Sequence, residues 1–363
     1  MLTTRLIKSY FLKVFANKKH IDFDIKNTKN VLFLRYDRIG DMIITTPVFR
    51  ELKQAYPQIK ISVLASKTNQ EVLINNPYIE KVITNYKNSF FADLPSLINL
   101  RRQNFDLCFE FDHSVIPHSI IRLRVIKPKK IISIKKTGRY GINGDDLSLY
   151  DIYTEKFEKS HFRDIWLGLL KPLNINSKSN TYDLFLDNID MDKAQKFVKK
   201  YSDKFLIGIN LEGAVKGKKI KFHQLCKICK GIYNNDNNIQ IIILCSPNNF
   251  QRVSKKVQEI GLHYVVMSYK TEKILNVAAL ISELDLIITP DTSIVHIAST
   301  FNKPLVSIHE NNRESYELFA PVSELNRTVF SDSKDNISRF SLSLLLRYTF
   351  ELMSIIKQEN YDE

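Results

Sequence analysis

Apolar and polar positions along this chain predict two successive sets of β-strands and α-helices. Strand-like apolar runs of the first half lie at residues 30–36, 59–65, 81–84, 105–111 and 130–134, with helical patterns at 45–56 and 114–125. A polar stretch at 174–182 has the composition of a linker. Beyond it, strand-like runs lie at 205–210, 239–245, 264–267, 284–289 and 304–309, with helical patterns at 222–232, 249–261 and 272–284. Such alternation indicates parallel βαβ units.

The pattern therefore predicts an α/β protein made of two Rossmann-like domains. We expect an N-terminal extension at 1–28, a first domain at 29–186 and a second domain at 187–335. Residues 336–363 should form a C-terminal helix that packs back on the domains. A length of 363 residues agrees with two domains. The two parallel sheets would face an interdomain cleft, which is a favoured place for a ligand site.

The extension has a helical pattern of its own. Its apolar residues share one stripe, namely Leu2, Leu6, Tyr10, Phe11, Val14 and Phe15, and its basic residues fall elsewhere. A basic amphipathic helix can lie in a membrane interface, or it can pack on its own domain, and the sequence leaves both open. No stretch has the ~18–20 apolar residues of a spanning helix, and residues 1–20 do not read as a secretory signal. We expect a cytoplasmic protein, with peripheral membrane contact at most.

The net charge of +14 is unevenly distributed. Residues 1–186 carry 30 Lys and Arg against 18 Asp and Glu, or +12, which leaves +2 for residues 187–363. A basic half suits an anionic partner such as nucleic acid, anionic lipid or a charged glycan. A non-catalytic basic protein that binds nucleic acid or glycan is therefore one alternative. We expect no nucleic-acid partner, because no recognised nucleic-acid fold or aromatic platform accompanies the charge.

The cysteines and acidic pairs do not predict a metal site. Cys226 and Cys229 have the spacing of half a zinc site, but no second pair of ligands completes it. Their i, i+3 spacing in a helical pattern favours small apolar side chains that face a core. The Asp-x-Asp formed by Asp22 and Asp24 precedes the first expected strand. We expect no bound metal.

Two polar turns carry candidate chemistry. RYDRIGDMIITTP, residues 35–47, follows a strand and leads into an expected amphipathic helix, so Asp41 would lie at the carboxyl end of a parallel strand, where open α/β sheets bind ligands. Asp291, Thr292 and Ser293 would begin another helix, with His296 one turn in. A helix N-terminus can bind phosphate, although a plain N-cap by Asp291 or Thr292 explains the same residues. Neither domain begins with G-x-G-x-x-G, and P-loop and G-x-S-x-G motifs are absent.

Three segments resemble glycosyltransferase family 9, the ADP-heptose:lipopolysaccharide heptosyltransferases. Residues 35–83 resemble its opening, with R-x-D-x-I-G-D followed by T-P, L-K and N-P. Residues 161–175 resemble the segment that ends its first domain, and 284–308 resemble its signature D-T-[GS]-x-x-H-x-A. The matches occur in the family's order over about residues 30–310. The resemblance implies a GT-B fold.

The implied reaction is the inverting, metal-independent transfer of heptose from ADP-heptose to the inner core of lipopolysaccharide or lipooligosaccharide. It would take place at the inner face of the inner membrane of a Gram-negative bacterium, with no cofactor beyond the nucleotide-sugar donor. Asp41 would be the general base, although it could also simply cap the helix that begins near Met42. The implied donor-binding residues are Lys219, Asp291, Thr292, Ser293 and His296. Lys218 competes with Lys219 because the register across KGKK is loose.

The acceptors of this family are anionic glycolipids, which gives the basic half a candidate partner. The candidate acceptor-binding residues are Arg35, Asp37, His113, Ser114, Arg122 and Arg124, with Lys127, Lys129 and Lys130 nearby. A solvated charged face is the commoner meaning of such a run.

The sequence departs from the family's pattern at three places. Ser293 stands where well-known members have glycine, residues 245–251 lack a glutamate that some members present to the nucleoside, and residues 308–323 replace a glycine-rich loop. Another nucleotide sugar with another surface glycan, or a member that binds donor without transfer, therefore remains an alternative.

Overall fold

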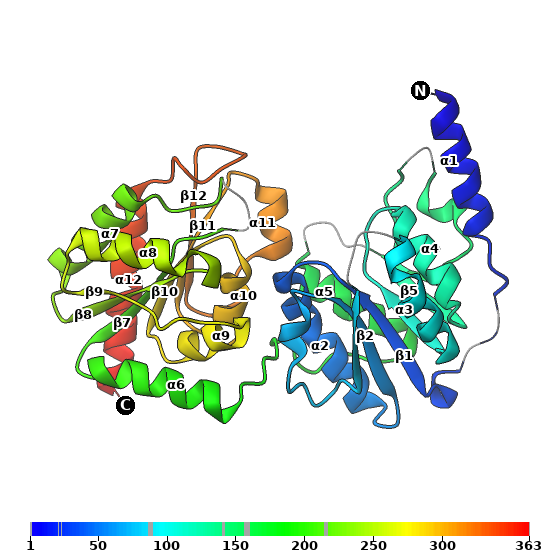
Figure 1. The fold of residues 1–363 in the computed structure, drawn as a ribbon, viewed down its shortest axis with the longest axis horizontal. Helices are drawn as coiled ribbons and strands as arrows, with labels where there is room; N and C mark the ends of the chain where they lie inside the picture. Colours follow the sequence, from blue (N-terminus) through cyan, green and yellow to red (C-terminus); the bar gives the residue numbers. More distant parts are fainter. Residues whose placement is uncertain are drawn as a thin grey trace. The chain divides into compact units, whose positions relative to one another are not determined.

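The computed structural model describes residues 2–362 except 21, 23, 86–89, 140–141, 156–159 and 214–216, and only the backbone of 2–8, 85, 90–92, 145 and 360–362. The chain forms two compact units, residues 1–181 and 182–363, each with its own sheet (Figure 1). The division falls in a segment at 175–187 that contains no helix or strand and includes most of the expected linker. Of the Asp-x-Asp considered above, Phe23 lies outside the described residues, and Asp24 caps a short 3-10 helix.

Unit 1, residues 1–181, is built on a parallel sheet with the strand order β3-β2-β1-β4-β5-β6. Its strands are β1 Asn30–Arg35, β2 Lys60–Ser66, β3 Lys81–Asn85, β4 Leu107–Glu110, β5 Lys130–Ile134 and β6 Ile152–Thr154. The five expected strands are confirmed. The sixth, β6, was missed because it is three residues long and half-buried, so it lacks the apolar run of a central strand.

Helices cover both faces of this sheet. They are α1 Leu2–Phe15, α2 Ile39–Ala55, α3 Phe90–Arg102, α4 Pro117–Ile126 and α5 Phe162–Leu167. Phe33 of β1 contacts Phe49 of α2 at a ring-centroid distance of 4.9 Å on one face. Leu32 and Leu34 belong to the core of the other face, together with Ile120 of α4. This alternation along β1 follows from the two-residue repeat of a strand.

The helix after β1 differs from the expected amphipathic helix that begins near residues 42–45. It begins at Ile39, and its residues are buried without interruption from Met42 to Leu52, because both β1, through Phe33, and α5 pack against it. Pro47 lies inside α2 and has no N–H to donate to the carbonyl of Ile43. The hydroxyl of Thr46 donates to that carbonyl instead, at 2.7 Å. Thr46 thus satisfies the carbonyl that the proline leaves without a backbone donor.

Unit 2, residues 182–363, repeats this topology with the strand order β12-β11-β10-β7-β8-β9. Its strands are β7 Phe205–Asn210, β8 Ile239–Leu244, β9 Val265–Met267, β10 Leu286–Pro290, β11 Leu305–His309 and β12 Asn326–Phe330. β12 was not expected, since its pattern is mostly half-buried. The paired strands described in both sheets run parallel to one another.

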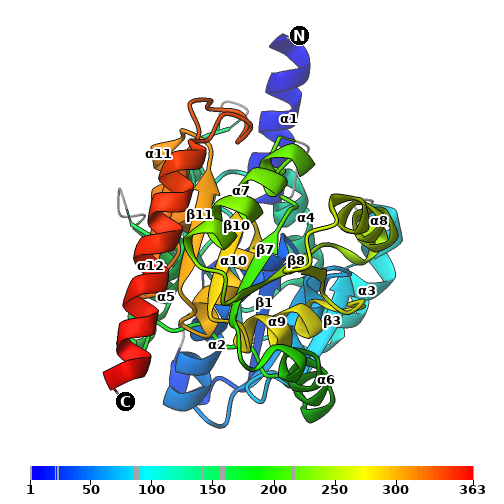
Figure 2. The same cartoon turned by 90° about the vertical axis from the view of Figure 1, so that its left-hand side faces the viewer.

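Helices also cover both faces of the second sheet. They are α6 Asn188–Val198, α7 Phe222–Asn235, α8 Phe250–Ile260, α9 Ile274–Ser282, α10 Ser293–Thr300, α11 Arg313–Phe319 and α12 Leu342–Asp362. The C-terminal helix α12 packs along α7 (Figure 2). A Cβ at Gly231 of α7 would lie 2.6 Å from a terminal methyl group of Leu346 of α12, so a larger residue there would force that side chain to move. Cys229 is buried as expected, whereas Cys226 is half-buried, and both are free thiols.

Both sheets change winding direction at their centre. In unit 1 the order places β1 beside β4, and in unit 2 it places β7 beside β10. Ligands of doubly wound sheets bind outside the carboxyl ends of the strands at this switch point. Asp37 and Asp41 follow β1, and Asp291 follows β10. The candidate residues therefore lie where the topology of each unit favours binding.

Candidate active site

The turn between β1 and α2 carries the carboxylate that the sequence predicts as the general base. Asp41 is the third residue of α2, and its Oδ2 accepts a hydrogen bond from the backbone N–H of Arg38 at 3.2 Å. Its other oxygen, Oδ1, lies 3.6 Å from the guanidinium of Arg35. A carboxylate in a first turn also interacts favourably with the helix dipole. Asp41 thus caps α2 through one oxygen, and its side chain remains 16% exposed.

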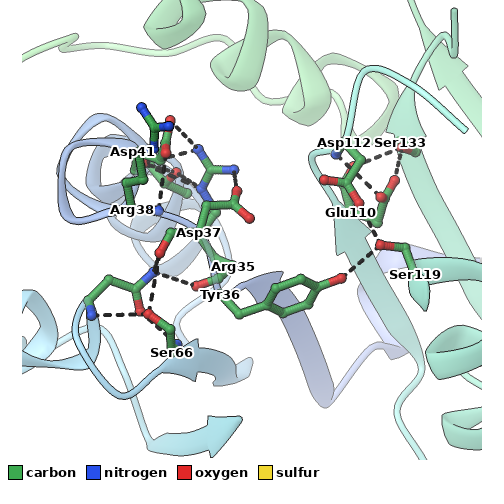
Figure 3. Close-up of polar contacts among 12 residues, drawn as sticks. Arg35, Tyr36, Asp37, Arg38, Asp41, Ser66, Glu110, Asp112, Ser119 and Ser133 are labelled. Carbon is green, nitrogen blue, oxygen red and sulfur yellow. Dashed lines mark hydrogen bonds and ion pairs between the residues drawn. The ribbon is translucent and has the colours of Figure 1, made fainter. Parts of the chain in front are cut away.

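Arg35 holds this turn together (Figure 3). The guanidinium, only 3% exposed, lies 3.9 Å from the ring centroid of Trp166. Its Nη1 donates to Asp37 at 2.6 Å, and its Nε donates to the hydroxyl of Thr45 at 2.9 Å. Its Nη2 donates to the backbone carbonyl of Asp41 at 3.2 Å. A planar, permanently charged group with this many partners fixes the positions of both carboxylates.

Asp37 is the carboxylate of this turn with the perturbed acidity. Burial raises the pKa of Asp37 to about 6, and the negative charges of Asp112 and Asp41 add to the rise. The positive charge of Arg35 opposes it. Since about a third of the side chain is exposed, Asp37 can exchange a proton with solvent close to neutral pH.

The loop after β2 supports the same turn from a neighbouring strand. The side-chain amide of Asn69, which is fully buried, donates to the carbonyls of Arg35 and Asp37 at 3.0 and 3.2 Å. The hydroxyl of Ser66 also donates to the carbonyl of Asp37, at 3.3 Å. Sequence reasoning missed both residues. Their signal was present in the polar SKTN that follows the strand ISVLA.

A buried ionic network lies across the switch point, at the end of β4. The ammonium of Lys136 contacts a carboxylate oxygen of Glu110 and donates to the hydroxyl of Ser133 at 2.7 Å. Burial raises the pKa of Glu110 despite this cation. Burial also favours a higher pKa for Asp112, but its hydrogen bond with Glu110 and the charge of Lys136 outweigh that effect and lower the pKa. Both Lys136 and Glu110 are almost completely buried.

This network reaches the first turn through hydroxyl groups. Ser119 of α4 donates to Oδ2 of Asp112 at 2.5 Å, and its oxygen lies 2.7 Å from the hydroxyl of Tyr36 (Figure 3). Tyr36 is the residue between Arg35 and Asp37. The acidic groups after β1 and β4 thus belong to one connected polar region. The sequence did not single out Glu110, Asp112 or Lys136.

The candidate acceptor residues lie in different environments. Arg122 is buried, its Nη2 donates to Asp93 at 2.9 Å, and its guanidinium lies 4.6 Å from the ring centroid of Tyr36. His113 is exposed and Ser114 is half-buried, both just past β4. Of the basic run, Arg124 and Lys130 are half-buried, and Lys127 and Lys129 are exposed. Arg35 and Arg122 therefore contact protein groups from buried positions, whereas His113 is exposed, with its ring centroid 5.8 Å from that of Phe162.

In unit 2 the second polar turn begins α10. Thr292 is the N-cap, and its hydroxyl accepts from the N–H of Ile294 at 3.0 Å. Ser293 is the first residue of the helix and is half-buried. Asp291 does not cap the helix, because its carboxylate accepts from the ammonium of Lys218 at 2.6 Å. The capping role thus falls to Thr292, which leaves Asp291 part of an ionic cluster.

The two candidate lysines have different partners. Lys218 contacts Asp291 and also Glu310, at 2.8 Å, and these carboxylates raise its pKa although burial opposes them. Lys219 lies 4.0 Å from Glu212, and its side chain is 41% exposed. Lys218 is therefore the lysine that the structure brings together with Asp291. Sequence reasoning missed Glu212, which lies two residues after β7, and Glu310, which directly follows β11.

Two buried histidines accompany this cluster. Burial lowers the pKa of His296 to about 4, with Asp291 opposing and His309 reinforcing the effect. Burial likewise lowers the pKa of His309 to about 4, where Lys218 reinforces it and Asp291 opposes it. His309 ends β11 and was not predicted. Both histidines are neutral at pH 7.

We expect these histidines to make unit 2 sensitive to acid. The unfolded chain takes up protons below about pH 6.5, whereas the folded histidines do so only near pH 4. Stability present above about pH 6.5 is therefore lost as the pH falls towards 4, by up to about 3 kcal/mol per histidine. Calorimetric unfolding between pH 7 and 4.5 measures this loss.

The matched variants are His309→Gln and, as a control, His223→Gln, which replaces an exposed histidine of α7. The slope of stability against pH should become shallower in His309→Gln and remain unchanged in His223→Gln. Equal slopes in all three proteins would contradict the assignment.

Comparisons with known proteins agree with this architecture. The profile of glycosyltransferase family 9 (heptosyltransferase) matches residues 99–344. A relative from Escherichia coli (strain K12), named as a candidate lipopolysaccharide heptosyltransferase 4, is 26% identical over 315 residues, which are 85% of this chain and 82% of the relative.

Solved structures show the same fold at low identity. A family 9 glycosyl transferase from Veillonella parvula has a TM-score of 0.74 and 17% identity, and the match covers 92% of this chain and 99% of that one. E. coli heptosyltransferase WaaC with ADP has a TM-score of 0.69 and 15% identity, with 89% and 99% covered. The fold class of two parallel sheets flanked by helices is thus confirmed as that of the GT-B heptosyltransferases. Because the family profile covers more than half of its length, this chain belongs to glycosyltransferase family 9.

Proposed function

We propose that this protein transfers a heptose from ADP-heptose to the inner core of a lipopolysaccharide or lipooligosaccharide, with inversion at the anomeric carbon. The observation that carries the proposal is the position of Asp41, a carboxylate held at the switch point of unit 1 in a chain of this family. Such sites are where doubly wound sheets bind ligands.

In the proposed reaction Asp41 is the general base. One of its oxygens takes the proton of the acceptor hydroxyl while the hydroxyl oxygen attacks the anomeric carbon, and the bond from that carbon to the diphosphate breaks on the opposite side. ADP leaves with the bonding electron pair. A positioned base contributes about 10²- to 10⁴-fold. Arg35 and Asn69 support this step by fixing the turn that carries Asp41.

The donor would be bound by unit 2 at the N-terminus of α10. Thr292, Ser293 and His296 would lie near the sugar and diphosphate, because helix N-termini attract anions. Of the two lysines, Lys218 is favoured for balancing the charge of the leaving diphosphate. Its ammonium contacts Asp291, the residue before the N-cap of α10, and so lies beside the turn where the donor would bind. No metal ion is proposed in the reaction.

The acceptor would contact unit 1. His113, Ser114 and Arg124 would contribute side chains at the surface, where anionic sugars can reach them. Arg35 and Arg122 would act from the layer beneath, through the ionic contacts described above, and Asp37, about a third of whose side chain is exposed, would be accessible to the acceptor. With a glycolipid acceptor, the reaction would take place at the cytoplasmic face of the inner membrane.

Turnover with purified components tests the proposal. ADP release from ADP-heptose should require a truncated lipooligosaccharide, continue in EDTA, and yield product of inverted anomeric configuration by NMR. Lys218→Gln should lower kcat/KM by about 10²-fold, and Lys219→Gln, the matched control, should leave it within about threefold.

Two results would overturn parts of this proposal. Turnover with a UDP- or GDP-sugar but not with ADP-heptose would replace the donor and retain the reaction class. If the folded protein turned over none of a panel of donors and acceptors, the assignment of a transferase would be wrong.

A further inference from the structure

The N-terminal helix α1 has two different faces along its described part. Leu12 is 7% exposed, and Ala16, directly after the helix, is fully buried, both within the core of unit 1. On the outside, Tyr10, Phe11, Val14 and Phe15 are 70%, 57%, 53% and 47% exposed. We call these four residues the apolar face of α1. The extension thus both packs on its own domain and presents apolar side chains to solvent.

Helix geometry explains how one helix does both. Successive residues are rotated by about 100°, so Tyr10 and Val14 lie one above the other, with Phe11 and Phe15 in the adjoining row. Leu12 lies on the opposite side and anchors the helix against α4. The predicted stripe is confirmed for these four residues, whereas the side chains of Leu2 and Leu6 lie outside the described residues.

This apolar face is unusual for the molecule. Seven large hydrophobic residues are exposed among those that the structure describes, and four of them are the apolar face. The other three are isolated along the chain: Ile74 lies between β2 and β3, Ile98 in α3 and Ile189 in α6. Scattered single residues need no explanation, but a contiguous apolar patch indicates an interaction surface. Figures 1 and 2 both show α1 extending away from the rest of unit 1.

The charge around the apolar face identifies the kind of partner. Residues 2–20 contain five Lys and Arg and no Asp or Glu. Lys19 is exposed, and Lys13, which lies 3.5 Å from Asp146, has a side chain that is 48% exposed. The first 186 residues as a whole carry +12. Apolar and aromatic side chains flanked by basic residues are complementary to an anionic lipid surface.

We propose that α1 docks this protein on the surface of a bilayer that contains anionic phospholipid, with the apolar face inserted among the acyl chains and head groups. Tyr10 suits such a boundary because its ring is apolar and its hydroxyl is polar. None of the described helices is long and apolar enough to cross a membrane. Lipid binding by α1 does not depend on the proposed transfer reaction.

Flotation with lipid vesicles tests this docking, using the full chain without donor or acceptor. The protein should bind vesicles of phosphatidylethanolamine and phosphatidylglycerol, and bind phosphatidylcholine vesicles much more weakly. Phe11→Ser with Phe15→Ser should weaken binding by about tenfold or more. Lys13→Gln with Lys19→Gln should weaken it by about fivefold per charge, and added salt should have the same effect as the charge removal.

The control variant is Ile189→Ser, which replaces an exposed apolar residue of α6 in unit 2. It should bind vesicles as the wild type does. Unchanged binding in the Phe11, Phe15 double variant, or no binding by the wild type, would overturn the proposal. A concentration-dependent dimer that forms in the wild type and in Ile189→Ser but not in the Phe11, Phe15 double variant would also overturn it, because a second copy of the chain would then cover the apolar face. Fluorescence of Trp166, which is buried in unit 1, verifies that each variant is folded.

Discussion

Asp41→Asn should reduce turnover by about 10²- to 10⁴-fold and leave unit 1 as stable as in the wild type. The loss is expected because an amide cannot take up the acceptor proton as a carboxylate does. The stability is expected to remain because an asparagine oxygen can still accept from the N–H of Arg38. Steady-state kinetics together with denaturant unfolding, followed by the fluorescence of Trp166, measures both quantities. Trp166 is the only tryptophan, so its signal reports on unit 1.

Asp41→Ala separates the base from the helix cap. It should lose the same activity and, in addition, about 0.5–2 kcal/mol of stability, because the hydrogen bond to the first turn of α2 is removed. Asp37→Asn serves as a comparison, since Asp37 contacts Arg35 without capping the helix. Full activity in Asp41→Asn would reduce Asp41 to a helix cap. If Asp37→Asn alone abolished turnover, the base would be Asp37.

Lys136→Met should destabilise unit 1 by about 3–5 kcal/mol. The ammonium of Lys136 is fully buried against Glu110, and removing it leaves a carboxyl group in the core without its cation. The remaining partners, Ser133 and the backbone of Asp112, also lose a hydrogen bond each. Denaturant unfolding followed by the fluorescence of Trp166 measures the effect without interference from unit 2.

The double variant with Glu110→Gln is the control for this prediction. Once both charges are gone, no unpaired ion remains buried, so the double variant should be more stable than Lys136→Met alone. A double-mutant cycle then gives the coupling between the two groups. Additive losses would show that the contact contributes no coupling and that Lys136 acts through packing alone. The loss of stability of unit 2 in acid should be the same in Lys136→Met as in the wild type, because His296 and His309 lie in unit 2 and Lys136 lies in unit 1.

Most of the architecture could be predicted because parallel strands that are buried on both faces read as apolar runs. The central strands of both sheets have this pattern, for example β7 and β8, whose residues are all buried. The edge strands β6 and β12 could not be recognised in the same way, since their residues are mostly half-buried. The start of α2 was misplaced because Pro47 and two threonines suggest a helix boundary, whereas the Thr46 hydroxyl satisfies the carbonyl that the proline leaves free.

The candidate site was predictable to the extent that it lies in local motifs. Asp41 lies in the first turn of α2 and Thr292 is the N-cap of α10, so short-range pattern indicated that both residues lie where a helix begins after a strand. The register between Lys218 and Lys219 was beyond such reasoning. Adjacent residues differ in direction, and only the folded loop shows that Lys218 reaches Asp291, 73 positions away.

The sequence by itself determined the alternation of strands and helices, the two-domain organisation and the family, because periodicity and motifs are local properties. The tertiary structure decided which charges meet. It paired Lys136 with Glu110 and Arg122 with Asp93, and it buried His309 beside Asp291. Interactions of this kind join residues from different strands and helices, and their strength depends on desolvation. Burial and distance arise only when the chain has folded, and for that reason no pattern of neighbours along the sequence contains them.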